Sequence, residues 1–157
     1  MKVLHIDSSI QGSGSATREL TREIVARLMA ARPDAQVTYR DLAAEELPHF
    51  SHVALTRADE LEAARNQAVL EEFLGADVLV IGAPLYNFSI PTQLKAWIDR
   101  IVIAGRTVTP SAVPKGLRAE SRSSPQWRAE VCTRRARLRN LASRISGSSW
   151  VFWESAM

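Results

Sequence analysis

The sequence has little of several features, and each scarcity excludes a class of protein. Its 157 residues include one cysteine, Cys132, so the chain has no internal disulfide and no cysteine cluster for a metal. No apolar run approaches the roughly 20 residues that a membrane-spanning helix needs. The first apolar stretch, residues 3–6, is too short for the core of a signal peptide. These absences favour a cytoplasmic protein with no membrane partner.

Two common nucleotide-binding motifs are also missing. Residues 12–17 read Gly-Ser-Gly-Ser-Ala-Thr and lack the last glycine, so the dinucleotide-binding fingerprint is incomplete. The sequence contains no Gly-Lys-Ser/Thr motif of a nucleoside triphosphate loop. His5, His49 and His52 form no evident acid–base pair, and we interpret them as structural or surface residues. A Rossmann domain that binds NAD without a flavin stays open as an alternative.

The composition and the apolar periodicity of the sequence predict one α/β domain. The apolar fraction of 46% and the charged fraction of 24% are those of an ordinary globular protein. Apolar periodicity predicts strands over residues 2–7, 36–42 and 78–82, and helices ending near residue 31 and spanning residues 57–74 and 91–104. Residues 43–56 are predicted as a loop. This alternating order is typical of a doubly wound parallel sheet.

The helical patterns also predict which side chains are buried. In the helix over residues 57–74 the candidates are Leu61, Ala64, Ala68, Phe73 and Leu74. In the helix over residues 91–104 they are Leu94, Trp97, Ile98 and Ile101. We expect both helices to pack against the sheet through these residues.

The loop after the first strand is rich in hydroxyl groups, which belong to Ser8, Ser9, Ser13, Ser15 and Thr17. Gly12 and Gly14 allow the backbone to turn there. A helix N-terminus offers unpaired N–H groups and a positive dipole end, so this loop is a candidate phosphate site. The alternative is that Ser15 or Thr17 only caps the helix.

The loop after the third strand carries two aromatic side chains, Tyr86 and Phe88, in a place where loops are usually polar. In a sheet ordered 2-1-3-4-5 the first and third strands are neighbours, so both loops meet where such folds bind ligands. Hydroxyls for a phosphate and an aromatic wall for a ring suit flavin mononucleotide (FMN). The alternative is that Tyr86 and Phe88 pack in the core or at a dimer contact.

Residues 85–100 read Leu-Tyr-Asn-Phe-Ser-Ile-Pro-Thr-Gln-Leu-Lys-Ala-Trp-Ile-Asp-Arg. This stretch closely resembles the bacterial FMN-dependent NADH-azoreductases, which are also NADH:quinone reductases. Their motif reads Pro-Met/Leu-Tyr-Asn-Phe-x-x-Pro/Ser-x-x-Leu-Lys. Segments resembling the same family lie at residues 8–10, 15–21, 41–43 and 103–107. The resemblance covers residues 1–107 and implies a flavodoxin-like fold with strand order 2-1-3-4-5.

The resemblance also implies roles for particular residues. The FMN phosphate would be held by Ser9, Ser15, Ala16 and Thr17. The isoalloxazine ring would be lined by Leu85, Tyr86, Asn87 and Phe88, with Asn87 bonding its polar edge. The flavin would carry hydride from NADH or NADPH to a quinone or azo compound, so no catalytic side chain and no metal are expected.

Family members are homodimers with the flavin at the interface, so the resemblance also implies a homodimer. A flavodoxin-like electron carrier, which does not turn over NADH alone, stays open as an alternative function.

The resemblance stops after Thr107. The family continues with a fourth strand, a Ser-x-Gly-Gly turn at the flavin and a fifth strand, and residues 108–157 show none of these patterns. We therefore divide the chain into a flavodoxin-like, FMN-binding part over residues 1–107 and an aberrant basic tail over residues 108–157.

We interpret the tail as the product of a reading-frame shift with truncation. Regrouping plausible codons for residues 144–154 yields text that resembles the family's Tyr-Leu-Arg-x-Phe-Leu-Gly-Phe-Leu-Gly segment. A shift in GC-rich codons also explains the arginines. Residues 1–114 have a charge balance of −3 and residues 115–157 one of +6. Binding of nucleic acid by the basic tail is the alternative, and it would weaken steeply with salt.

The departure has a physical consequence. Without its last two strands the sheet would leave the apolar edge of the third strand unpaired, which favours aggregation. We expect such a chain to fold poorly or to bind FMN weakly.

Overall fold

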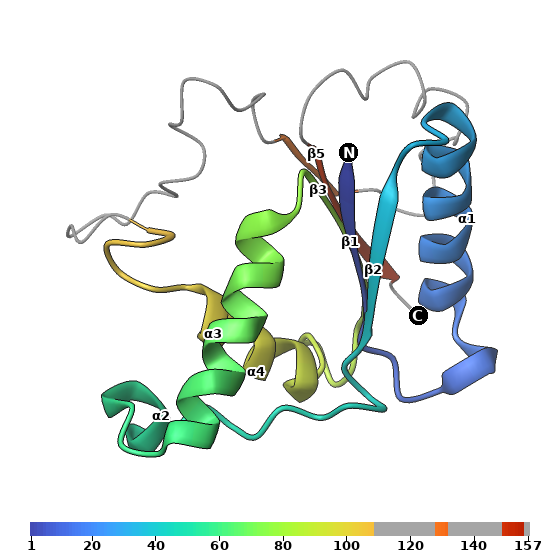
Figure 1. The fold of residues 1–157 in the computed structure, drawn as a ribbon. Helices are drawn as coiled ribbons and strands as arrows, with labels where there is room; N and C mark the ends of the chain where they lie inside the picture. The colour runs from blue at the N-terminus through green and yellow to red at the C-terminus, as the bar shows by residue number, and fades with distance from the viewer. Residues whose placement is uncertain (109–127, 132–148, 156–157) are drawn as a thin grey trace.

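The computed structural model describes residues 1–108, 128–131 and 149–155 as an α/β fold (Figure 1). Its elements are β1 (Lys2–Asp7), η1 (Gly12–Gly14), α1 (Ala16–Ala31), β2 (Gln36–Asp41), α2 (His52–Thr56), α3 (Glu60–Gly75), β3 (Val78–Pro84), α4 (Thr92–Ile101), β4 (Arg128–Val131) and β5 (Ser149–Ser155). Cys132 lies outside the described residues. So do residues 144–148, which belong to the segment used for the frame-shift interpretation. In the described ranges no helix combines the length and apolar character needed to cross a bilayer.

The strands form one parallel sheet in the order β2-β1-β3-β5-β4. The order of the first three strands confirms the predicted flavodoxin-like, doubly wound arrangement. Asp7, the last residue of β1, lies opposite Asp41 of β2 and Gly82 of β3. α1 covers one face of the sheet and α3 and α4 the other (Figure 1). The loops that leave β1 and β3 therefore start side by side at the carboxyl edge.

The sheet beyond β3 differs from the expectation for residues 108–157. β5 pairs in parallel with β3 from Leu79 to Pro84, and β4 pairs with the far side of β5. The sequence of β5 includes Trp150, Val151 and Phe152, residue types enriched in strands, and the edge of β3 offers a free backbone ladder. The third strand is thus paired on both sides from Leu79 to Gly82. The order is also not the expected 2-1-3-4-5, because the last strand of the chain occupies the fourth position.

Two apolar clusters flank the sheet because side chains alternate along β1. Leu4 and Ile6 face α3 and α4, whereas Val3 faces α1. Trp97 of α4 is buried in the first cluster, where its ring meets Phe73 edge to face at 6.0 Å between centroids. The alternation leaves His5 and Asp7 on the α1 face, where an apolar residue would be usual.

The buried face of α3 differs from the prediction. Leu61 is 72% exposed and Ala64 and Ala68 are also exposed, while the buried residues are Val69, Leu70 and Phe73. Of the predicted set only Phe73 is buried, and Leu74 is half-buried. The prediction for α4 is confirmed for Leu94, Trp97 and Ile101, with Ile98 half-buried. α3 is the harder case because its alanines fit either face of the helix.

The segment predicted as a loop over residues 43–56 contains the short helix α2. Arg57 ends α2 in a left-handed conformation with φ of 55°. Asp59 then caps α3, because its carboxylate accepts a hydrogen bond from the Glu62 N–H at 2.8 Å. The cap explains why α3 begins at Glu60, three residues later than the periodicity predicts.

Gly82 provides the space for a buried carboxylate. A Cβ atom at this position would lie 2.6 Å from Asp7 Oδ1 and 3.2 Å from Thr21 Cγ2. Asp7 is 3% exposed and accepts a hydrogen bond from the Thr21 hydroxyl at 2.8 Å. Glycine in the middle of the sheet is therefore required by close packing, since Asp7 and Thr21 occupy the volume of a side chain.

We predict that Gly82→Ala destabilises the protein by about 1–3 kcal/mol, because the new methyl group displaces the buried Asp7 carboxylate. Gly75→Ala is the matched control, since a Cβ at Gly75 meets no atom within 4 Å. Urea denaturation of the two variants measures the difference. Equal midpoints for Gly82→Ala and the unsubstituted protein would contradict the packing argument.

Candidate functional site

The first loop at the carboxyl edge, residues 8–15, is called the hydroxyl loop. Ser8 fixes its start, because the Ser8 backbone N–H and hydroxyl both bond to the Gly82 carbonyl, at 3.2 and 2.7 Å. Ser9 follows and is 1% exposed. The loop then emerges into solvent from Ile10 to Gly14 and passes through the short helix η1. Its beginning is thus tied to β3, while its exposed part is free to meet a ligand.

The hydroxyl loop ends at the cap of α1. The Ser15 hydroxyl accepts a hydrogen bond from the Arg18 N–H at 3.3 Å and lies 2.9 Å from the Thr17 hydroxyl. Ser15 and Thr17 are 4% and 2% exposed. Ser15 therefore caps α1, and both hydroxyls already have partners inside the protein.

Backbone donors of this loop are nonetheless free. Within the described residues, no hydrogen-bond acceptor is found for the N–H groups of Gly12, Ser13, Ala16 and Thr17. They lie at and just before the N-terminus of α1, where the helix dipole is positive. The arrangement is suited to an anion that binds mainly through backbone N–H groups.

The second loop, residues 85–90, is called the aromatic loop. Tyr86 and Ser89 exchange two backbone hydrogen bonds, at 2.8 and 3.0 Å, across Asn87 and Phe88. The φ angles of Asn87 and Phe88 are 49° and 66°, so both central residues are left-handed, as in a type I′ hairpin turn. Asparagine tolerates this conformation, but phenylalanine is strained in it.

The strain leaves Phe88 in an unusual position. The side chain is 98% exposed, and the turn projects it away from the protein. The core-packing alternative is therefore excluded for Phe88. A strained backbone that holds a fully exposed aromatic ring is the kind of feature found at ligand-binding sites.

Tyr86 connects the two loops. Its hydroxyl lies 3.1 Å from the Ser9 hydroxyl and accepts a hydrogen bond from the Ile10 N–H at 3.3 Å. The prediction that the loops after β1 and β3 meet is thus confirmed at the level of side chains. Tyr86 is half-buried, and its hydroxyl is engaged by the neighbouring loop.

A buried polar network lies behind the hydroxyl loop, and Arg18 is its centre. The Arg18 guanidinium donates to both carboxylate oxygens of Asp41, at 2.6 and 2.7 Å. It also donates twice to the Ser9 carbonyl, at 3.3 and 2.8 Å, and once to the Tyr39 hydroxyl at 3.1 Å. These bonds join α1, β2 and the hydroxyl loop.

The network perturbs the acidities of its members. The Arg18 guanidinium holds the pKa of Asp41 below its ordinary value, and Asp41 in turn raises the pKa of Arg18. Burial opposes ionisation of Asp7, but His5 and Thr21 outweigh it and lower the pKa of Asp7. Burial and the neighbouring Asp7 raise the pKa of Tyr39 to about 12. At neutral pH the charge of Arg18 is therefore offset by two carboxylates.

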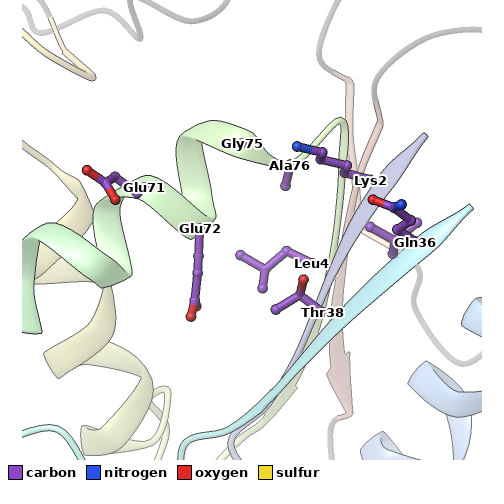
Figure 2. A pocket seen from close by; sticks show the side chains of 9 residues that line it. Lys2, Leu4, Gln36, Thr38, Glu71, Glu72, Gly75 and Ala76 are labelled. Atoms are coloured by element: carbon purple, nitrogen blue, oxygen red, sulfur yellow. The ribbon is translucent and has the colours of Figure 1, made fainter.

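A separate cleft lies at the other end of the strands. It has a volume of about 280 Å³ between α3 and the amino-terminal halves of β1 and β2. Figure 2 shows Leu4, Thr38 and Glu72 directed into it from the strands and from α3. Its lining carries both Lys2 and the glutamates of α3 and lies far along the strands from the two loops. None of its lining residues belongs to the hydroxyl loop or to residues 85–90.

The structure brings the sequence-predicted site residues to one edge but gives them unequal access. Ser9, Ser15 and Thr17 are buried, Leu85 and Tyr86 are half-buried, and Ala16, Asn87 and Phe88 are exposed. Sequence reasoning missed the network of Asp7, Arg18, Tyr39 and Asp41. A signal was present, since Asp7 and Asp41 both end strands beside the start of α1.

Comparison with known proteins agrees with this architecture. A family model for the flavodoxin-like fold matches residues 1–122. The FMN-dependent NADH:quinone oxidoreductase 1 of Pseudomonas syringae pv. tomato is 53% identical, over 74% of this chain and 63% of that protein. The FMN-dependent NADH:quinone oxidoreductase of Rhizobium meliloti is 50% identical, over 74% of this chain and 62% of that protein. The chain thus spans less than two thirds of the length of these relatives.

Solved structures show the same fold. The crystal structure of azoreductase AzrA matches with a TM-score of 0.69 and 27% identity, over 85% of this chain and 69% of that one. An FMN-dependent NADH-azoreductase from Bacillus anthracis, solved in complex with FMN, matches with a TM-score of 0.70. It is 17% identical, over 98% of this chain and 87% of that one, so this likeness concerns the fold alone. From the family match over residues 1–122 and the strand order β2-β1-β3, the chain belongs to the flavodoxin-like fold family.

Proposed function

We propose that the protein is an FMN-dependent NADH:quinone oxidoreductase that also accepts azo compounds. The observation that carries the proposal is the junction of the two loops by Tyr86 and Ser9 at 3.1 Å. This contact brings the hydroxyl loop, with its free backbone N–H groups, next to the aromatic loop, with its exposed aromatic side chain, at one edge of the sheet. The similar oxidoreductases from Pseudomonas and Rhizobium support the choice of FMN and NADH.

The residues of the hydroxyl loop fit a phosphate, although in a different way from the sequence prediction. The hydroxyls of Ser15 and Thr17 are buried and bonded to each other, so the backbone N–H groups of Ala16 and Thr17 are the better donors. Both stand at the N-terminus of α1 with no acceptor in the described part of the chain. We propose that Ser9, Ser15, Ala16 and Thr17 hold the FMN phosphate chiefly through this backbone.

The aromatic loop fits the flavin ring. Phe88 is 98% exposed, and covering it with a flat ligand would remove a large apolar surface from water. We propose that Leu85, Tyr86, Asn87 and Phe88 line the ring, with the exposed Asn87 amide reaching its polar edge. The strained turn keeps Phe88 outside the protein, so the aromatic side chain is already in place when the ligand arrives.

The chain's own residues bind and orient, and the bound FMN would supply the hydride transfer between NADH or NADPH and the acceptor. No side chain is assigned a proton-transfer role. The Tyr86 hydroxyl bonds to Ser9 and Ile10, so it fixes the position of the aromatic loop relative to the hydroxyl loop. The proposal includes a cytoplasmic homodimer, in which a second copy would cover the exposed aromatic loop.

Flavin titration tests the proposal. We expect FMN to bind more tightly than riboflavin, because only FMN carries the phosphate for the α1 N-terminus. Added NADH should bleach the visible band of the bound flavin, and a quinone should restore it. FMN is added in excess beforehand, so that the site is filled before the reductant is introduced. Tight NADH binding without flavin absorbance would favour an NAD-binding domain and contradict the proposal.

Phe88→Gly separates the strain of the aromatic loop from its function. Glycine adopts positive φ freely, so we expect this variant to be more stable by about 0.5–1 kcal/mol in urea denaturation. Loss of the aromatic contact should weaken FMN binding about two- to tenfold. Met29→Ala, which removes another exposed apolar side chain near the far end of α1, is the control for affinity. Unchanged FMN affinity in Phe88→Gly would remove Phe88 from the site.

A further inference from the structure

Arg18 stands where a phosphate-binding arginine would be expected, in the first turn of the helix that ends the hydroxyl loop. Its contacts exclude that role. Nε, Nη1 and Nη2 together make five hydrogen bonds, to Asp41, Ser9 and Tyr39. A guanidinium has five N–H donors, so none is left for a ligand. The side chain is also only 10% exposed.

The two bonds to Ser9 act on one peptide group. A trans peptide directs the Ser9 carbonyl and the Ile10 N–H to opposite sides, and no cis peptide occurs in the described chain. Arg18 donates to the carbonyl on one side of the peptide group, at 2.8 and 3.3 Å. The Tyr86 hydroxyl accepts from the N–H on the other side, at 3.3 Å. The Ser9–Ile10 peptide group is thus held from both sides, by α1 and by the aromatic loop.

Asp41 sets the position of Arg18 in turn. Its carboxylate takes two guanidinium N–H groups and also accepts from the Ala43 N–H at 3.0 Å. Asp41 is the last residue of β2, so the end of an edge strand determines where the guanidinium lies. A planar fork is needed here, because it must meet the carboxylate and the carbonyl at once.

We propose that Arg18 is a positioning residue for the phosphate of the bound flavin: it orients the Ser9–Ile10 peptide group, and through it the hydroxyl loop and Tyr86, without contacting the phosphate. The inference rests on the proposed function, since it concerns the same site. Rotation of this peptide group would break the Tyr86 contact and turn the following loop. The loop that leads to the N–H groups of Ala16 and Thr17 would then lose its position.

The chain contains a matched control for this inference. Arg40 and Glu72 form a second two-pronged ion pair, at 2.9 and 2.7 Å, between β2 and α3. Arg40 is 16% exposed and Glu72 30%, against 10% and 21% for Arg18 and Asp41. This pair also ties β2 to a helix, but on the opposite face of the sheet. Glu72 lines the separate cleft of Figure 2 rather than the loops.

The experiment compares Arg18→Lys with Arg40→Lys in the full chain. Lysine keeps the charge but cannot reach the carboxylate and the carbonyl together. For each variant the dissociation constants of FMN and riboflavin are measured, together with the urea midpoint and the hydrogen exchange of the Ile10 amide. The ratio of the two dissociation constants reports on the phosphate alone, so a general loss of stability does not change it.

We expect Arg18→Lys to reduce the preference for FMN over riboflavin about tenfold and to speed exchange at Ile10, while Arg40→Lys changes neither. Both variants should lower the urea midpoint to a similar extent. An unchanged preference in Arg18→Lys, or an equal loss in both variants, would overturn the inference and leave the proposed function intact. Failure of the unsubstituted protein to bind FMN in excess would overturn the proposed function and this inference with it.

Discussion

The hydrogen bonds from Arg18 to the Ser9 carbonyl are the constraint on which the candidate site depends. Asp41 at the end of β2 holds the guanidinium in place, and the guanidinium in turn fixes the start of the loop after β1. The Tyr86 hydroxyl extends the same constraint to the loop after β3. Two side chains, Arg18 and Tyr86, thereby hold together three segments that are distant in sequence. The exposed part of the hydroxyl loop is left free for a ligand.

Several residues at the carboxyl edge of the sheet have conformations or environments that are unusual for their type. Asp7 is a buried carboxylate, and Gly82 on the neighbouring strand has no side chain because Asp7 occupies that volume. Phe88 is held in a left-handed conformation that exposes it almost completely. Buried charge, close packing and backbone strain all occur within a few residues of the carboxyl ends of β1 and β3. The rest of the described core is ordinary apolar packing, which supports these local costs.

The sheet continues beyond β3, although the sequence predicts that its last two strands are missing. The sequence motifs quoted above predict that the resemblance to the azoreductases ends near Thr107, and the family model matches as far as residue 122. β5, which lies beyond both limits, still pairs with β3 along six residue positions. The backbone ladder of a strand accepts any chain of suitable register, because its hydrogen bonds do not depend on side chains. A sheet edge can therefore be covered by a sequence that lacks the family's pattern. The frame-shift interpretation and the boundary at residue 107 stay predictions.

The sequence by itself determined the alternation of strands and helices, the order of the first three strands, and the loops that make up the candidate site. These follow from local periodicity and from a motif that is contiguous in the chain. Only the tertiary structure decided which face of α3 is buried, since Leu61 and Val69 look equivalent in sequence. It also decided that Ser15 and Thr17 bond to each other, and that all the donors of Arg18 are taken. The reason is that a hydrogen bond depends on where atoms from distant segments meet, and no local pattern records that.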